Sequence, residues 1–298
     1  MHLGAITAIL EDKYTSWRPE FVAVGQGLDS IAYRAVHPDF GPVVVKVPLS
    51  RIITNDNDEY LSSEDLLKQE VKIYDAVRSA GIPTPEPYYL HVGRDGLLFL
   101  LMSYVETDKS APNGHECGAI LRRLHNAKFD LPYRTVCCVE ECTELTIAKL
   151  IVKRCTAISR LSGLTINLPS YQTLFDSQKS PYRNDSLLHL DYRSDNILCL
   201  KSSVKGVIDW SNALIGSPLI EIFRVIESNE FGDDFFRGYG HYQSCSHTCE
   251  IIYRLYTVSM LCIVFLSEAP DEVLARRYLD RLIELTTDLK LQLKRSAP

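Results

Sequence analysis

The chain has 298 residues and a mass of 33.8 kDa, more than a single hydrophobic core usually serves, so we expect two lobes that share a cleft. Hydrophobic residues make up 46% of the chain and charged residues 23%, a balance that excludes an intrinsically disordered protein. The net charge of −6 argues against nucleic acid or an anionic membrane surface as the main partner.

The N-terminal segment and the cysteines bear on the compartment. The segment MHLGAITAILEDKY has no basic leader and no small-residue cleavage site, so no signal peptide is predicted. The longest apolar stretch, residues 255–266, is too short to cross a bilayer and is predicted to be a buried core helix. Nine scattered cysteines without a CxxC pair favour a reducing compartment over a disulfide framework. We therefore expect a cytoplasmic protein that does not span a membrane.

The N-terminal part predicts a small sheet with one helix. Runs of β-branched and aromatic residues, separated by turn residues, predict strands at 21–24, 31–36, 42–48, 88–93 and 97–105. Residues 62–81 combine a Ser cap, acidic residues in the first turn, apolar residues at helical spacing and a terminal Gly, which predicts a helix. The stretch around residues 55–58 is predicted to be a loop.

The remainder of the chain is mainly helical by pattern. Apolar periodicity predicts one helix over residues 114–128, one or two more over 137–161, and a helical tail from about Glu250. Short strands are predicted at 187–191 and 204–210, around the turn KSSVKG. The prediction is an α+β fold with an N-terminal lobe over residues 1–105 and a C-terminal lobe over residues 106–298.

The stretch HLDYRSDNIL, residues 189–198, concentrates polar groups between apolar strands. An Asp and an Asn five residues apart on one loop, Asp191 and Asn196, can aim a carboxylate at a substrate hydroxyl while the amide oxygen holds a divalent cation. Asp209, at the end of a following strand, can bind the same metal, and His189 can orient the loop. Arg193 and Asp195 are predicted to pair with each other and receive no catalytic role.

HLDYRSDNIL followed by IDW resembles the catalytic and metal-binding loops of the aminoglycoside phosphotransferase and choline kinase superfamily, relatives of protein kinases. The family pattern is HGDxxxxN, then an ID-aromatic segment and GDPxxDL. Here Leu190 stands in place of the Gly, and Ser217 and Glu221 stand in place of the two acids of the last motif. Glu221 can still act as an anion at the start of a helix.

The resemblance extends to the front half of the chain. GQGLDSIAYRA, with Gly25, Gly27 and Ser30, is similar to the turn that covers the nucleotide phosphates. Lys46 resembles the strand lysine that pairs with the α- and β-phosphates. Glu70 matches the helical glutamate that holds this lysine, with Glu64 on the same helix as the alternative. Residues 102–105 fall where the hinge should offer backbone groups to adenine, and this assigns Ser103, Tyr104 and Val105 to nucleotide binding.

The resemblance implies a protein-kinase-like fold, with a five-stranded antiparallel sheet and one helix in the small lobe and a mainly helical larger lobe. It also implies transfer of a phosphoryl group from ATP, with Mg²⁺, to a small-molecule hydroxyl near Asp191. Two alternatives stay open. The first is a nucleotide-binding pseudokinase, which the replaced acids of the GDPxxDL motif allow. The second is a protein kinase, although no APE motif and no long peptide-seating loop follow IDW.

The acceptor is not fixed by these motifs. Four acids, Glu227, Glu230, Asp233 and Asp234, precede four tyrosines at 239, 242, 253 and 256. Acids and aromatic faces suit an amine-bearing acceptor, aminoglycoside-like or choline-like, while a solvated acidic turn explains the acids equally well. His241, Cys245 and Cys249 have the spacing of a helical metal site, but unpaired cytosolic cysteines are the favoured interpretation.

Overall fold

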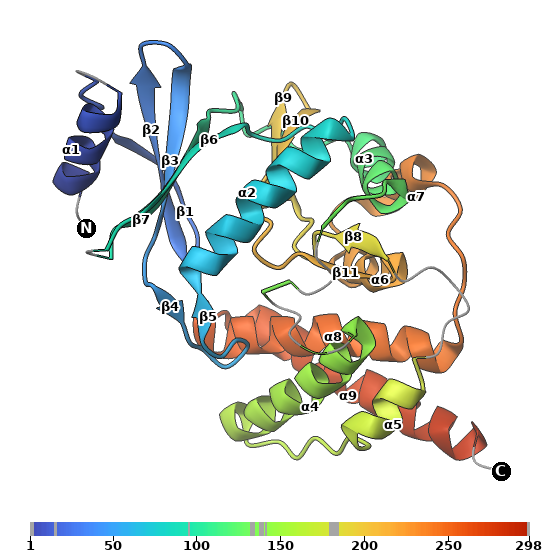
Figure 1. Ribbon diagram of the computed structural model, residues 1–298. Coiled ribbons are helices and arrows are strands. Elements are labelled where there is room, and N and C mark those ends of the chain that lie inside the picture. The colour runs from blue at the N-terminus through green and yellow to red at the C-terminus, as the bar shows by residue number, and fades with distance from the viewer. Residues whose placement is uncertain are drawn as a thin grey trace.

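The computed structural model describes residues 3–14, 17–94, 96–131, 135–136, 140, 142–178 and 185–296. A small lobe with a twisted sheet lies beside a larger, mainly helical lobe (Figure 1). The α+β, two-lobe architecture predicted from the sequence is therefore confirmed.

The small lobe is built on a five-stranded antiparallel sheet in the order β1-β2-β3-β7-β6. The strands are β1 (Val22–Gln26), β2 (Ser30–His37), β3 (Gly41–Pro48), β6 (Pro87–Val92) and β7 (Leu98–Ser103). All five lie where the sequence predicts strands, with small shifts at their ends.

The alternation of side chains between the two faces of β3 determines where Lys46 points. Val43 and Val45 are fully buried on one face of the sheet, in a cluster with Ile6 of helix α1 (Leu3–Lys13). Since successive strand residues point to opposite faces, Val44 and Lys46 face the other side, where α2 (Ser63–Ser79) packs. The helix α1 was not predicted from the sequence, and it gives the small lobe a second helix.

Helix α2 begins where its cap was predicted. The Ser62 side chain accepts a hydrogen bond from the Asp65 N–H, as an N-cap residue does. Leu67, Glu70 and Tyr74 are buried on one face of the helix, at the three- and four-residue spacing of an amphipathic helix. Glu70 is thus the acid on the inward face.

The stretch predicted to be a loop around residues 55–58 lies within a short hairpin of β4 (Ile52–Ile53) and β5 (Leu61–Ser62). This β4–β5 hairpin extends from the small lobe to the large one (Figure 1). Asn57 Nδ2 donates to the carbonyl of Met260 at 3.3 Å, and Lys153 Nζ lies 3.3 Å from the Glu59 carboxylate. The hairpin therefore joins the two lobes beside the cleft.

The large lobe carries the remaining elements. Its helices are α3 (Gly114–Asn126), α4 (Thr143–Ser162), α5 (Tyr171–Asp176), α6 (Pro218–Ser228), α7 (Gly232–Tyr239), α8 (His247–Ile263) and α9 (Glu272–Ser296). Its short strands are β8 (Ser186–Leu188), β9 (Ile197–Leu200), β10 (Ser203–Val207) and β11 (Leu214–Gly216). The strands form two small antiparallel pairs, β8 with β11 and β9 with β10, and the loops with Asp191 and Asp209 follow β8 and β10.

Helix α8 continues into a π-helical turn, Val264–Glu268. Together they form the one helical segment in the described part of the chain, His247–Glu268, that is long and apolar enough to cross a membrane. The length argument made from residues 255–266 was therefore wrong. The interpretation as a core helix rests instead on packing, because Ile252, Leu255 and Val258 are fully buried in the core of the large lobe.

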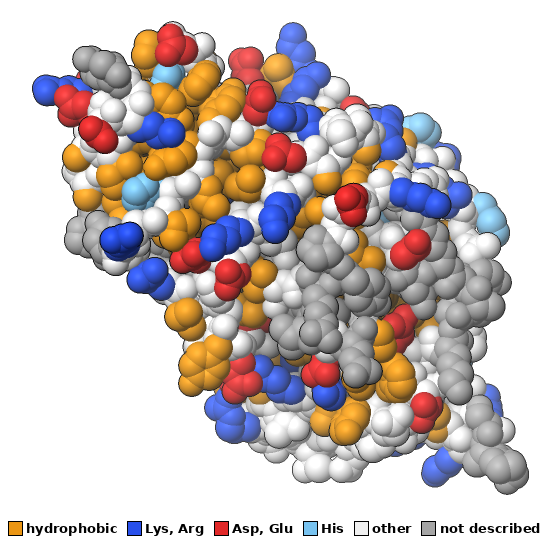
Figure 2. Space-filling model, viewed as in Figure 1, with side chains coloured by type: hydrophobic (Ala, Val, Ile, Leu, Met, Phe, Trp, Pro, Cys, Tyr) orange, Lys and Arg blue, Asp and Glu red, His pale blue; other side chains and the backbone are white. Residues whose placement is uncertain are grey.

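The surface carries both signs of charge. Figure 2 shows Lys and Arg side chains interspersed with Asp and Glu across the visible face, and hydrophobic side chains gathered over the small lobe. This face carries no extended field of one sign, in keeping with the modest net charge of −6.

Candidate active site

Lys46, Glu70 and Asp209 form an ion-pair network in the cleft between the lobes. Lys46 Nζ donates to both carboxylate oxygens of Glu70, at 3.0 and 2.8 Å, and to Asp209 Oδ1 at 3.1 Å. Glu64, the alternative partner, instead pairs with Lys68 on the exposed side of α2. Glu70 is therefore the residue that holds the lysine.

Lys46 and Asp209 keep each other ionised. Burial lowers the pKa of Lys46, but the carboxylates of Asp209 and Glu70 outweigh burial and raise that pKa above its usual value. The charge of Lys46 in turn holds the pKa of Asp209 below its usual range. A cation is thus fixed in the cleft, where it can meet phosphate oxygens.

The turn between β1 and β2 borders a cavity of about 150 Å³ that also contains the ion-pair network. Gly27 and Ser30 line this cavity, and the Gly27 N–H donates to the Ser30 carbonyl at 2.9 Å. Gly25 lies in β1 opposite Ala32 and does not line it. An added Cβ on Gly25 would meet no atom within 4 Å, so the protein itself imposes no glycine there.

The predicted hinge offers fewer backbone donors than expected. The Ser103 N–H already donates to Glu86 O at 2.8 Å, and the Tyr104 N–H donates to Pro42 O at 3.0 Å. These two amides are therefore not available to adenine, which corrects the expectation for them. The Val105 amide has no partner among the described residues, and the Val105 side chain packs against Gly206. None of the three residues lines the cavity beside Lys46.

Asp191 is held by three neighbours. Asn196 Nδ2 donates to Asp191 Oδ2 at 2.7 Å and to the Asp191 carbonyl at 2.9 Å. Arg224 Nη2 donates to Oδ1 at 2.7 Å, and Arg193 Nε donates to Oδ2 at 3.2 Å. Burial raises the pKa of Asp191, but the two guanidinium groups outweigh burial and hold the pKa below its usual range. Asp191 is thus an oriented, ionised acceptor of hydrogen bonds.

Arg224 was missed by the sequence analysis, although a signal for it was present. It lies three residues after Glu221 on α6, so both side chains project from the same side of that helix. Arg193 also pairs with Asp195 at 2.6 Å, as predicted.

Glu221, on α6, braces the loop that carries Asp191. Its two carboxylate oxygens accept hydrogen bonds from the backbone N–H groups of His189, at 3.1 Å, and Leu190, at 2.7 Å. His125 Nε2 lies 2.9 Å from the same carboxylate. Burial raises the pKa of Glu221, but these hydrogen bonds outweigh burial and lower the pKa below its usual value. Ser217 caps α6 by accepting from the Leu219 N–H. The two residues that replace the family's acids therefore still anchor this loop and this helix.

His189 supports the loop rather than facing the cleft. Its ring is fully buried, Nε2 lies 2.9 Å from the Ile208 carbonyl, and Nδ1 accepts from the Asp191 N–H at 3.2 Å. Nε2 is therefore the protonated nitrogen, and the ring joins the Asp191 loop to the strand end before Asp209. The geometry makes His189 a positioning residue and not one that meets the substrate.

Asn196 and Asp209 fit a magnesium site. The amide nitrogen of Asn196 is used by Asp191, and this leaves its Oδ1 without a hydrogen bond among the described residues. Asp209 Oδ1 contacts Lys46 and Ser211, while the side chain as a whole is 39% exposed to the cleft. Carboxylate and amide oxygens are the ligands that Mg²⁺ prefers, so these two side chains are chemically suited to hold it.

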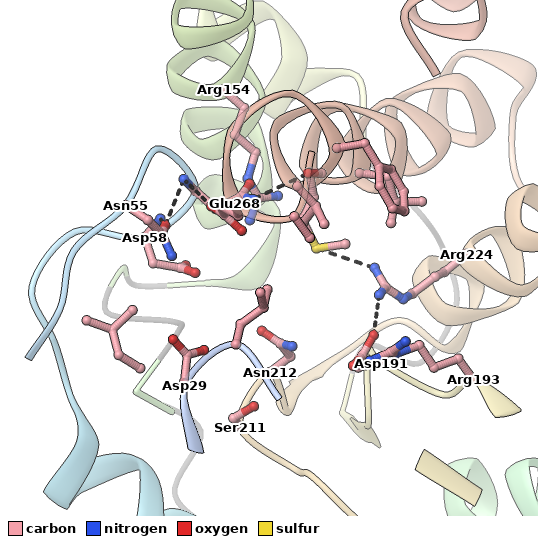
Figure 3. Close-up of a pocket in the computed structure, with 18 of the residues that line it drawn as sticks. Asp29, Asn55, Asp58, Arg154, Asp191, Arg193, Ser211, Asn212, Arg224 and Glu268 are labelled. Carbon is pink, nitrogen blue, oxygen red and sulfur yellow. Dashed lines mark hydrogen bonds and ion pairs between the residues drawn. The ribbon is translucent and has the colours of Figure 1, made fainter. Parts of the chain in front are cut away.

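A second cavity, of about 350 Å³, adjoins the first and also reaches Asp191. Its residues come from the small-lobe turn after β1, the β4–β5 hairpin, α4, the Asp191 loop, α6, α8 and α9. We call this second cavity the acceptor cavity. Figure 3 shows Asp29 and Asp58 on one side of it and Arg224, bonded to Asp191, on the other.

The acidic segment proposed for the acceptor does not form this cavity. Glu227 is buried in ion pairs with Arg254 and Arg281, and the Tyr239 hydroxyl bonds to His125. Of the acids and tyrosines named for that purpose, Glu230 is the one that lines the acceptor cavity. The other acids and tyrosines of this segment do not line this cavity, so they have no part in binding an amine there.

The segment with His241, Cys245 and Cys249 does not form a metal centre in the described part of the chain, where no group of three such side chains is close enough to hold an ion. Cys249 Sγ lies 4.0 Å from the Gln178 carbonyl, and the His241 carbonyl accepts from Arg122. Both described cysteines of this segment are free thiols.

The bilobal fold, the Lys–Glu–Asp network and the Asp–Asn loop place the chain in the class of kinase-like phosphotransferases. A model described as "Phosphotransferase enzyme family" matches residues 20–251, most of the chain. The protein belongs to this family.

Solved structures with the same fold are aminoglycoside phosphotransferases. The GDP complex of aminoglycoside 2'-phosphotransferase-IIIa matches with a TM-score of 0.65 and 18% identity, over 97% of this chain and 99% of that one. A thermostable mutant of APH(4)-Ia with AMP-PNP and hygromycin B matches at 0.63 and 14%, over 95% and 98%. ADP-bound APH(2'')-Ib matches at 0.61 and 17%, over 96% and 98%. At these identities the likeness establishes the fold. The comparison with curated proteins found no match.

Proposed function

We propose that this protein transfers the γ-phosphoryl group of ATP to a hydroxyl of a small molecule held in the acceptor cavity. The observation that carries the proposal is the position of Asp191, which lines both the cavity beside Lys46 and the acceptor cavity. A carboxylate at the junction of two cavities can orient a hydroxyl in one toward a phosphoryl group in the other.

Each residue in this proposal has a defined task. Lys46, held by Glu70, pairs with phosphate oxygens, and the turn with Gly27 and Ser30 covers them. Asn196 and Asp209 would hold Mg²⁺, which supplies neutralisation of the phosphate charge. The Val105 amide is the hinge donor that remains for the adenine ring.

The acceptor oxygen forms a bond to the γ-phosphorus while the bond from that phosphorus to the bridging oxygen of ADP breaks, and ADP leaves with the electron pair. The hydroxyl proton passes to Asp191. Since Arg224 and Arg193 lower the pKa of Asp191, it is a weak base, and it accepts the proton late in a loose transition state.

We place the boundary between the nucleotide-binding lobe and the catalytic lobe at residues 105 and 106. The chain is proposed to act in the cytoplasm on a small-molecule acceptor, without nucleic acid as a partner. The binding-module alternative rested on the replaced acids of the last motif. Its support is weakened by Glu221, which accepts from two backbone amides of the catalytic loop.

The test is Asp191→Asn, which keeps the size of the side chain and removes its charge. We expect transfer to fall by about 10²–10⁴-fold, the usual contribution of a positioned acid or base, with ATP affinity nearly unchanged. Asp209→Asn should instead weaken binding of the Mg²⁺–ATP complex. Acceptor phosphorylation is followed by ³¹P NMR over a panel of amino alcohols, hydroxy acids, hydroxy amino acids and aminoglycosides, and ATP binding by calorimetry.

The matched control is Asp195→Asn, in the same loop, because Asp195 is 74% exposed and pairs only with Arg193 among the described residues. If Asp191→Asn behaves like this control, the assignment of Asp191 is wrong. If ATP binds but no acceptor in the panel is phosphorylated, the chain is a nucleotide-binding module.

A further inference from the structure

The acceptor cavity contains acceptor oxygens that lack donors. The carboxylates of Asp29 and Asp58 receive no hydrogen bond and no ion pair from the described residues. Glu268 Oε1 accepts from Asn57 Nδ2 at 3.1 Å, and no donor reaches Oε2 in the same part of the chain. The cavity is lined by all four of these residues, Asp29, Asn57, Asp58 and Glu268.

The side chain of Asn57 provides an independent sign that this cavity binds a hydrogen-bond donor. Its side chain is 3% exposed, and its Oδ1 has no hydrogen-bond partner. A buried carbonyl oxygen without a donor is costly unless a ligand supplies one. Burial, and to a lesser degree the charge of Asp58, raises the pKa of Glu268, so this wall holds more negative charge than its surroundings compensate. An ammonium group has several N–H donors and a positive charge, so it can satisfy these acceptor oxygens.

Arg154 lies in the same cavity and lacks an acidic partner. The side chain is 4% exposed, and its Nε is buried without a hydrogen bond. Nη1 makes a long contact of 3.4 Å with the Tyr256 carbonyl, and the guanidinium lies 4.9 Å from the centre of the Tyr256 ring. No carboxylate of the described residues comes within ion-pair distance, although Glu268 lies near it (Figure 3).

A buried guanidinium without an anion is as costly as a buried carboxylate without a cation. Its planar set of donors matches a carboxylate, which it binds through two parallel hydrogen bonds. The cavity thus presents an anion-binding group next to cation-binding groups, and Arg154 acts on Glu268 through its charge without forming an ion pair with it. An acceptor with both charges close together fits this arrangement.

We propose that the acceptor is a compact zwitterion, with an ammonium on Asp58, Glu268 and Asn57, a carboxylate on Arg154, and its hydroxyl at Asp191. This deepens the proposed function and rests on it. The cavity of about 350 Å³ is at the small end of the usual range for ligand sites. A cavity of this volume disfavours a multi-ring aminoglycoside.

The β4–β5 hairpin gives the site a link between the lobes. Asn57 and Asp58 come from the small lobe and Glu268 and Arg154 from the large one. The Asn57–Glu268 hydrogen bonds already join them across the cleft. An ammonium shared by both sides binds only when the lobes are in this arrangement, in which Asp191 faces the nucleotide cavity.

The first experiment compares matched acceptors. 2-Amino-4-hydroxybutyrate carries all three groups, 3-aminopropan-1-ol lacks the carboxylate, and 4-hydroxybutyrate lacks the ammonium; serine, ethanolamine and 3-hydroxypropionate form a shorter set. We expect kcat/KM to fall at least about tenfold on loss of either charge, the factor that about 1.4 kcal/mol of lost interaction gives. Hygromycin B should be poorer still. The inference is overturned if an amino alcohol or hygromycin B is the best acceptor.

The second experiment assigns each charge to a residue. Asp58→Asn should raise KM for the amino acid and the amino alcohol, but not for the hydroxy acid. Arg154→Gln should raise KM for the amino acid and the hydroxy acid, but not for the amino alcohol. Because the selectivity is measured within each variant, a general loss of folded protein cannot imitate it.

The controls are Glu59→Gln and Arg160→Gln, on the same hairpin and the same helix, because both side chains are mostly exposed and neither lines the cavity. If Asp58→Asn and Arg154→Gln match these controls while some acceptor is still phosphorylated, the zwitterion site is wrong and the proposed function stands. If no acceptor is phosphorylated at all, the proposed function fails first.

Discussion

The nucleotide side of the cleft is built around a closed network of paired charges, whereas the acceptor side also contains charged side chains that have no ion-pair partner among the described residues. Lys46, Glu70 and Asp209 satisfy one another at 2.8–3.1 Å before any ligand arrives. In the acceptor cavity, Asp58 and Arg154 have no ion-pair partner within the described residues. The first arrangement is complete without its ligand, and the second is not.

This difference has a physical meaning. A phosphate-binding lysine must keep its charge and direction in every turnover, so a fixed internal partner serves it. An acceptor site gains selectivity when its groups are satisfied by one ligand and left unsatisfied by others. Stability is expected to rest on the nucleotide side, and selectivity on the acceptor side at some cost in stability.

The largest effect is expected from breaking the paired side, by Glu70→Ala. The Glu70 side chain is 2% exposed, and its removal leaves Lys46 with Asp209 alone and the buried Tyr74 hydroxyl without an acceptor. We expect a loss of about 3–5 kcal/mol in the free energy of unfolding, measured with urea. Glu64→Ala on the same helix removes only a surface pair with Lys68 and should cost under about 1 kcal/mol. Equal losses in the two variants would contradict the ranking.

The unpaired side should respond in the opposite direction, with Glu268→Gln as the smaller effect. Because burial raises the folded-state pKa of Glu268, the ionised carboxylate opposes folding. This opposition is absent below the unfolded pKa and appears as the pH rises through the folded pKa. The difference in Tm between the variant and the native protein should therefore grow, in favour of the variant, from about pH 4 to about pH 8. Gln keeps the oxygen that Asn57 contacts, so this hydrogen bond is not lost.

Thermal melts at the two pH values measure this gain. Glu284→Gln, at a 67% exposed surface position, is the control and should show little change between them. A Glu268→Gln variant that loses stability at the higher pH would mean that the carboxylate is satisfied inside the protein, and the contrast between the two sides would fail.

The same contrast explains what the sequence could predict. Lys46, Glu70, Asp191, Asn196 and Asp209 each lie in a short pattern that fixes both residue type and secondary structure, so their convergence followed from the order of the motifs. The acceptor cavity is assembled from segments far apart in the chain, none with a local pattern of its own. Asn57 and Glu268, for instance, meet only because the β4–β5 hairpin lies against the turn after α8.

Misassigned residues failed for the same reason. Glu227 stands in an acidic, aromatic stretch that is typical of an amine site. Its carboxylate, however, forms an ion pair with Arg281, which lies far along the chain in α9. The amides of Ser103 and Tyr104 were expected to be open, and Pro42 and Glu86 use them. Local composition shows which groups are present, whereas tertiary pairing decides which remain free for a ligand.

The smallest expected effect is the difference between an Ala and a Gly variant at Leu190, where the family pattern has Gly. Its φ is 57°, in the left-handed region, and its side chain is 2% exposed in the core of the large lobe. The Glu221 carboxylate, which accepts from the Leu190 N–H, holds this strained turn. Leu190→Ala should cost about 2–5 kcal/mol by leaving a cavity while the backbone strain stays. Leu190→Gly leaves a larger cavity but relieves about 1–2 kcal/mol of left-handed strain.

We therefore expect Leu190→Gly to be no less stable than Leu190→Ala in urea unfolding, the reverse of the usual order, in which Gly is the worse residue by about 0.5–1 kcal/mol. Leu188 provides the control, because it is equally buried in strand β8 and has no positive φ. There Gly should be less stable than Ala. If both positions show the same order, the Asp191 loop is not strained, and Glu221 serves only to satisfy the two amides it contacts.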